Sequence, residues 1–134
     1  MTSKRKYGFR CQYQKGNECI SVCINSEKII GCEEIMVALA ELAVKVQYYK
    51  NDKIGGEVAL QVLMIHERIM KDFFQRYNNE FKKSYYLNRK SKRKEYRTER
   101  VDIEFYGDFG GEDKKHILNE YIHKYRETKG WGNE

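Results

Sequence analysis

The chain has 134 residues, a formal net charge of +6 and 40% hydrophobic residues. That length fits one ordinary domain, and the apolar content is enough for a core, which excludes a wholly disordered chain. No N-terminal apolar stretch is typical of a secretion signal, and the long apolar segments carry charges within a membrane-spanning length. We therefore expect a single domain over residues 1–134, in the cytoplasm and without membrane contact.

The first quarter of the chain alternates between apolar and polar residues, as β-strands do. Tyr7–Tyr13 and Cys19–Ile24 are two such runs, and Gly16-Asn17 between them is typical of a two-residue hairpin turn. The turn predicts a register with these opposite pairs: Gln14 and Cys19, Gln12 and Ser21, Arg10 and Cys23. A further turn and a short strand at Lys28–Cys32 would complete a three-stranded antiparallel meander.

Four cysteines in this region raise the question of a zinc site: Cys11, Cys19, Cys23 and Cys32. In the predicted register Cys19 and Cys23 lie ~13 Å apart along one strand, too far to share an ion, and Cys11 points to the opposite face. A disulfide is not expected in a cytosolic protein. We expect Cys11 in the core, the other three partly covered, and neither a metal nor a cofactor.

The middle of the chain predicts two helices in an antiparallel hairpin. Glu33–Tyr49 is apolar around most of its circumference, and Glu57–Phe81 is apolar on one side, with Lys50–Gly56 as the turn between them. Leu60 and Met64 lie on the polar side of the second helix. This surplus apolar surface suggests a homo-oligomer, unless the C-terminal segment covers it.

The strongest functional signal is a basic segment, residues 82–100. Nine cations stand against two carboxylates, Glu95 and Glu99, which gives a local net charge of +7, so the rest of the chain sums to −1. Cations neutralise phosphates, and interleaved tyrosines can stack on unpaired bases. The candidate binding residues are Lys82, Lys83, Tyr85, Tyr86, Arg89, Lys90, Lys92, Arg93, Lys94, Tyr96, Arg97 and Arg100.

Two alternatives to a nucleic-acid site remain open for this region. The basic segment could be a solvated loop that keeps the protein soluble, since no helix-turn-helix, RNP-type or GXXG signature accompanies it. The strand predicted at Val101–Tyr106 carries Asp102 and Glu104 on one face, as metal-dependent nucleases do. The outer face of an edge strand explains that pair equally well, and no third acidic group is evident.

The C-terminal part adds a glycine-rich turn, Gly107–Gly111, and an amphipathic helix, Glu112–Thr128. The turn lacks the Gly-Lys-Ser/Thr of a phosphate-binding loop. His116, Glu120 and His123 share the outer side of the helix, which we interpret as a solvated face. No nucleophile and base are paired anywhere in the sequence, so no catalytic residue is assigned.

The sequence thus predicts an α+β domain in the order β-β-β-α-α-β-α. The function that it favours is non-enzymatic binding of a phosphate-rich ligand, RNA or DNA, through the basic segment. The alternative is an inhibitor or adaptor of the kind that phages and mobile elements encode, which binds a host defence protein or sequesters a signalling nucleotide.

Overall fold

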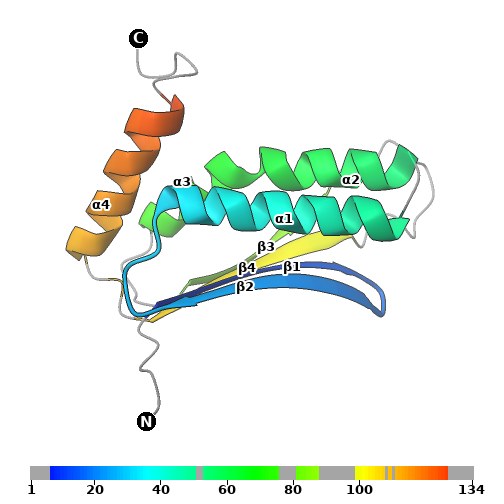
Figure 1. The fold of residues 1–134 in the computed structure, drawn as a ribbon, viewed down its shortest axis with the longest axis horizontal. Coiled ribbons are helices and arrows are strands. Elements are labelled where there is room, and N and C mark those ends of the chain that lie inside the picture. Colours follow the sequence, from blue (N-terminus) through cyan, green and yellow to red (C-terminus); the bar gives the residue numbers. More distant parts are fainter. Residues whose placement is uncertain are drawn as a thin grey trace.

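The computed structural model describes residues 7–50, 53–75, 81–87, 99–107, 109 and 111–126. A four-stranded antiparallel sheet forms one layer, and helices cover one of its faces (Figure 1). The strands are β1 (Tyr7–Lys15), β2 (Glu18–Ser26), β3 (Phe81–Tyr86) and β4 (Arg100–Gly107). The helices are α1 (Cys32–Lys50), α2 (Lys53–Met64), α3 (His66–Gln75) and α4 (Gly111–Tyr121), which continues as a π-helical turn at Ile122–Arg126. The α+β class is confirmed, but the order of elements is β-β-α-α-α-β-β-α.

The N-terminal hairpin has the register that the turn predicts. β1 and β2 pair without a break from Tyr7 opposite Ser26 to Lys15 opposite Glu18, and Gln14 lies opposite Cys19. Gly16 has φ +56°, a left-handed conformation that glycine adopts without a steric penalty. Because side chains alternate along a strand, this register places the apolar residues of both strands on the face that the helices cover.

The third strand predicted at Lys28–Cys32 does not exist. Ile30 is fully buried, the backbone N–H of Gly31 donates to Glu34 Oε1 at 3.3 Å, and Cys32 already begins α1. The stretch therefore anchors the connection in the core and caps the helix instead of pairing in the sheet. The sequence of this stretch resembles a strand because its apolar residues would be buried in a strand and are also buried in this connection.

The third strand of the chain is β3. It begins at Phe81, where the predicted helix was expected to end, and continues into the first residues of the basic segment. Strands lie in the order β2-β1-β4-β3, so β4 is central, between β1 and β3. The prediction that Asp102 and Glu104 lie on an edge strand is therefore wrong. The predicted inward face of this strand is confirmed, because Val101, Ile103 and Phe105 are all fully buried.

The helical hairpin is confirmed in its main features, with α1 and α2 side by side and antiparallel (Figure 1). Lys50–Gly56 is not all turn, because α2 begins at Lys53. The predicted helix Glu57–Phe81 is divided at Ile65 into α2 and α3, although Ile65 N–H donates to the carbonyl of Gln61 at 3.2 Å. The division lets α3 depart from the direction of α2, and the chain returns to the sheet at Phe81.

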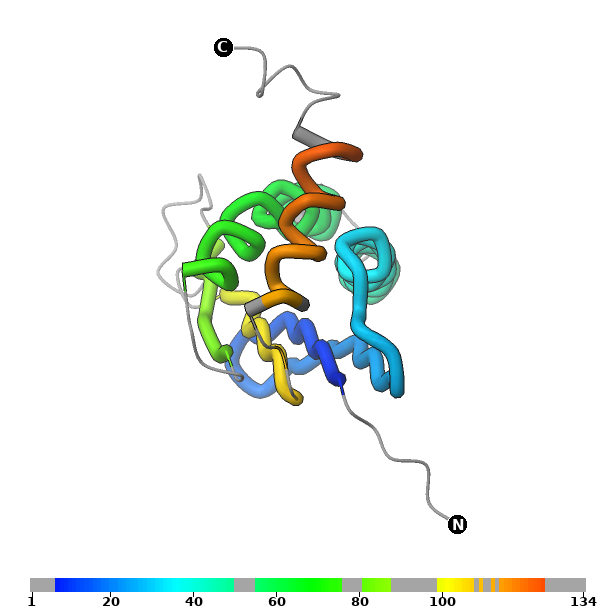
Figure 2. The backbone as a smooth tube through the Cα atoms, turned by 90° about the vertical axis from the view of Figure 1, so that its left-hand side faces the viewer, coloured from blue at the N-terminus to red at the C-terminus, as the bar shows by residue number. Residues whose placement is uncertain are grey.

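The core lies between the sheet and the helices and ends in a cluster of aromatic rings. Phe73 of α3 contacts Phe105 of β4, Phe81 of β3 and Phe109, with ring centroids 4.0, 6.0 and 5.4 Å away. α4 crosses the end of the helical layer (Figure 2), where Tyr121 packs edge-on against the buried His66 at 5.0 Å. Across the described residues, no helix is both long enough and apolar enough to span a bilayer.

Candidate nucleic-acid interface

The two ends of the basic segment are paired strands of the sheet. Tyr86 at the end of β3 lies opposite Arg100 at the start of β4, and Leu87 N–H donates to the carbonyl of Glu99 at 3.0 Å. Between Leu87 and Glu99, the eleven residues 88–98 carry six cations and one carboxylate in the sequence, a net charge of +5. Seven predicted site residues lie outside the described residues: Arg89, Lys90, Lys92, Arg93, Lys94, Tyr96 and Arg97.

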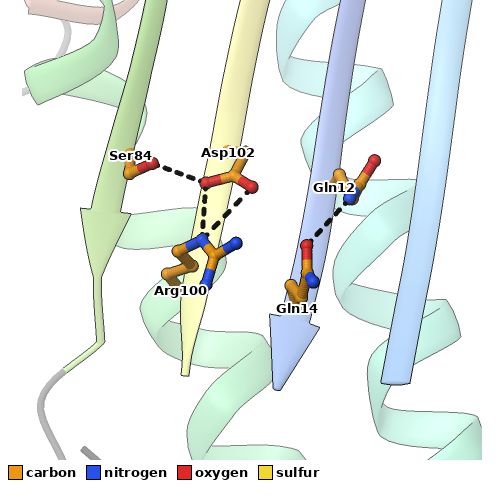
Figure 3. Close-up of polar contacts among 5 residues, drawn as sticks. All are labelled: Gln12, Gln14, Ser84, Arg100 and Asp102. Carbon is orange, nitrogen blue, oxygen red and sulfur yellow. Dashed lines mark hydrogen bonds and ion pairs between the residues drawn. The ribbon is translucent and has the colours of Figure 1, made fainter. Parts of the chain in front are cut away.

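The segment's ends border the open face of the sheet, the face opposite the helices. Tyr86, Arg100 and Gln14 form one row across β3, β4 and β1, and the next row contains Ser84, Asp102 and Gln12 (Figure 3). Figure 3 shows the labelled side chains on the near side of the strands and the helices behind them. Sequence reasoning did not extend the site to this face, although strict alternation along β1 and β4 predicts it.

Asp102 is held by two neighbours on this face (Figure 3). Ser84 Oγ donates to Asp102 Oδ1 at 2.6 Å, and Arg100 Nε donates to both carboxylate oxygens at 3.0 and 3.3 Å. On β1, Gln12 Nε2 donates to Gln14 Oε1 at 3.1 Å. The contact with Asp102 fixes the orientation of Arg100, which lies where the open face meets the basic segment.

Glu104 lies between two cations on the same face. Its carboxylate oxygens are 3.7 Å from Arg10 and 3.1 Å from Lys82, and these residues surround a shallow hollow of about 400 Å³. Both carboxylates of the nuclease alternative are thus engaged by cations. Within the described part of the chain, no three histidine, cysteine or acidic side chains are grouped so that they could hold a metal ion.

Lys83 and Tyr85 point to the helical side of β3 and contact α3. Lys83 Nζ and the Tyr85 hydroxyl donate to Asp72 Oδ2 at 2.7 and 2.9 Å, and Arg68 lies 5.4 Å from the centre of the tyrosine ring. Tyr85 is only 1% exposed, so its ring is not available to stack on a base. Desolvation tends to raise the pKa of Asp72, but the hydrogen bonds from Lys83 and Tyr85 outweigh it and hold that pKa below 3.8.

Tyr86, one residue further on, differs from Tyr85 in every respect that matters for binding. It is 63% exposed and lies on the open face beside Arg100. Alternation along Phe81–Tyr86 separates the two tyrosines, because Phe81 and Tyr85 are the buried members of the strand. Of the three candidate stacking tyrosines, Tyr86 is the one that the described structure presents to solvent.

The base of the segment is anchored by a buried carboxylate. Glu99, which precedes β4, is 1% exposed, and its Oε2 accepts a hydrogen bond of 2.8 Å from the hydroxyl of Tyr13. Tyr13 is itself fully buried. A carboxylate in such a place needs polar partners, because unpaired burial of a charge is costly. The contact ties the end of the basic segment to β1.

At the opposite end of the open face, Tyr106 lies across β1. A Cβ at Gly8 would overlap the ring of Tyr106, whose hydroxyl donates to Asn25 Oδ1 at 3.0 Å. Glycine at position 8 therefore permits the ring of Tyr106 to approach the backbone of β1 this closely.

The four cysteines are free thiols and divide into two pairs by exposure. Cys11 is buried as predicted, whereas Cys19 and Cys23, which were predicted to be partly covered, are exposed on the open face of β2. Cys32, predicted to be partly covered, is fully buried as the first residue of α1. Burial raises the pKa of the Cys11 thiol to about 12 and that of Cys32 to about 11.

The outer side of α4 carries the histidines that were interpreted as a solvated face. His116 Nε2 lies 3.5 Å from Glu120 Oε1, one helical turn away, and its side chain is 62% exposed.

No family model matches the chain, and no curated protein and no solved structure matches it either.

Proposed function

We propose that the protein binds RNA or DNA, without catalysing a reaction, through the basic segment and the adjoining end of the open sheet face. The observation that carries the proposal is the pairing of Tyr86 with Arg100. It fixes both ends of a connection of net charge +5 and presents an exposed aromatic ring beside a cation. Two different modes of contact with a nucleic acid are thereby brought to one place.

The physical basis is the chemistry of a single strand. Its phosphates attract lysine and arginine and release counterions on binding, which gives a strong dependence on salt. Its unpaired bases stack on aromatic rings, with little preference for one base. In the basic segment the cations supply the first contact, and Tyr86 supplies the second. The carboxylates Asp102 and Glu104 orient cations in this proposal and have no catalytic role.

The test is the affinity of the purified protein for a fluorescent, mixed-sequence single-stranded RNA, measured by anisotropy over a series of salt concentrations. In the first variant, serine replaces five cations: Arg89, Lys90, Lys92, Arg93 and Lys94. We expect weaker binding and a log–log salt slope that is shallower by up to ~3.5, because each lost phosphate contact removes about 0.7 from the slope.

A matched variant removes the same charge from elsewhere in the molecule. Serine replaces five lysines on α1, α3, α4, the π-helical turn after α4 and the connection after β2: Lys28, Lys45, Lys71, Lys115 and Lys124. If net charge alone governs binding, the two variants lose the same affinity. If the basic segment binds, the matched variant keeps most of the parent's slope. Equal losses in both variants would contradict the proposal.

A pull-down from cell lysate, with and without nuclease treatment, separates this function from the inhibitor or adaptor alternative. Nucleic acid that co-purifies and is lost on nuclease treatment supports the proposal. A protein partner that is retained after nuclease treatment, with no nucleic acid bound, supports the alternative.

A further inference from the structure

The free edge of β2 lacks the features by which sheet edges avoid pairing with another chain. β2 pairs with β1 alone in the described sheet, and its nine residues carry a single charge, Glu18, at one end. The ladder to β1 has no bulge, and the sequence has no proline. Natural edges are usually short, charged, bulged or interrupted by proline, because a regular edge offers a row of backbone donors and acceptors.

The other edge of the same sheet shows the contrast. β3 has only six residues, and two of them are Lys82 and Lys83. Lysine on an edge strand discourages pairing with another strand. The sheet is thus protected on its β3 edge and unprotected on its β2 edge.

An apolar stripe of α1 runs beside the β2 edge. Val37, Val44 and Tyr48 are 60%, 65% and 79% exposed, and their spacing of seven and four residues places them on one face of the helix. Two hollows of about 920 and 460 Å³ lie between this stripe and β2. In the end-on view α1 is the helix above the β2 side of the sheet (Figure 2).

We infer that β2 and the α1 stripe form the interface of a homodimer, in which β2 pairs antiparallel with β2 of a second copy. A twofold axis through Val22 places Ile20 opposite Ile24 of the second copy on the helical side. On the open side it places Ser21 opposite Cys23. No pair in this register brings like charges together, so the strand is complementary to itself.

The charges of α1 are complementary in the same arrangement. The hollow near the start of α1 is lined by three carboxylates, Glu33, Glu34 and Glu41, and the other hollow by Lys45, Tyr48, Tyr49 and one carboxylate, Glu18. The twofold axis reverses the second copy, so the acidic half of one copy meets the half of the other in which Lys45 balances Glu18 and two tyrosine hydroxyls can donate. A parallel pairing would place the acidic halves together. The charge pattern therefore selects the antiparallel dimer as the occupant of this edge.

The dimer has one continuous sheet of eight strands, with a β3 at each outer edge. The two basic segments then lie at opposite ends of the sheet, far from the interface. Dimerisation is therefore independent of the nucleic-acid proposal, and either can fail without the other.

The experiment is sedimentation velocity on the full chain, after nuclease treatment and a high-salt wash to remove bridging nucleic acid. We expect a dimer for the parent protein. The double variant S21K/C23K places lysines directly opposite each other in both cross-strand pairs, and we expect its dimer to dissociate roughly tenfold more easily or more. The matched variant S21E/C23K places glutamate opposite lysine in both pairs, and we expect it to remain dimeric.

Circular dichroism establishes that both variants are folded, and V44S/Y48S on α1 gives a second probe that leaves the sheet unchanged. We expect this variant to dimerise more weakly than the parent. A monomeric parent, or a dimer that S21K/C23K leaves unchanged, overturns the inference. So does a monomeric S21E/C23K, which would contradict pairing about Val22.

Discussion

Phe73 of α3 stacks on Phe105 of β4, with ring centroids 4.0 Å apart and planes inclined by 20°. Both rings are fully buried. The contact joins the end of the helical layer to a central strand of the sheet, across 32 positions of sequence. Phe109, Phe81 and Phe74 surround the same ring of Phe73. This position therefore tests the architecture more directly than any other.

We predict that Phe73→Ala destabilises the protein by ~3–5 kcal/mol, because it removes a buried ring and leaves a cavity. That is a large fraction of the stability of one small domain. The measurement is urea unfolding of the purified variant. Gln75→Ala is the matched control, since Gln75 is exposed at the end of the same helix. We expect it to change stability by about 0.5 kcal/mol or less. Equal and large losses would contradict the helical arrangement.

Asp72 gives a prediction about acid stability. Its pKa is held below 3.8 in the folded protein by hydrogen bonds from Lys83 and Tyr85. A carboxyl whose pKa is depressed on folding stabilises the protein above its unfolded-state pKa, and the stabilisation is lost as the pH falls through the folded-state value. We therefore expect Asp72→Asn to reduce the difference in unfolding free energy between neutral pH and about pH 3.

Tyr85→Phe keeps the carboxylate and removes one of its two hydrogen bonds. We expect a loss of about 1 kcal/mol at neutral pH and an acid dependence between those of the parent and Asp72→Asn. An Asp72→Asn variant with the parent's full dependence on pH would show that this cluster does not contribute.

Tyr86 should contribute to binding without contributing to stability. We predict that Tyr86→Ala weakens binding of single-stranded RNA by ~1–3 kcal/mol, the range for loss of one stacked base. Its unfolding free energy should stay within about 0.5 kcal/mol of the parent's, because the ring is exposed. Tyr49→Ala removes another exposed tyrosine, on α1, and should leave the affinity unchanged. Identical affinity of the Tyr86 variant and the parent would exclude stacking on this ring.

The cysteines should react in two classes. At neutral pH we expect a thiol reagent to modify Cys19 and Cys23 quickly in the native protein, and Cys11 and Cys32 only after unfolding. The reactive species is the thiolate, and burial raises the pKa of Cys11 to about 12 and of Cys32 to about 11. The measurement is the number of cysteines per chain that react with a chromogenic disulfide reagent in native and in denatured samples, read from the thiolate that the reagent releases. A Cys19→Ser/Cys23→Ser variant should lose the fast reaction, and four fast thiols would contradict the fold.

Local patterns in the sequence determined the N-terminal hairpin. The glycine at position 16 and the alternation on either side of it fix which residues face each other, since the turn joins neighbours in the chain. The same holds for α1 and for the buried side of α2 and α3, where Val58, Val62, Ile69 and Phe73 recur at helical spacing. Periodicity also identified the inward residues of β4.

Tertiary structure alone decided the order of the strands in the sheet. It also decided which side chains at the start of the basic segment face the helices and which face solvent. Ile30 is buried whether it belongs to a strand or to a connection, so its apolar neighbours could not distinguish the two. The lysines in Phe81–Tyr86 concealed a strand, because Asp72, the ion-pair partner of Lys83 on the helical side of β3, lies on another element. Pairing between distant strands depends on contacts that no local window contains. For that reason the sequence shows a run of charge and tyrosines, whereas the fold decides that Tyr85 is buried and Tyr86 is presented to solvent.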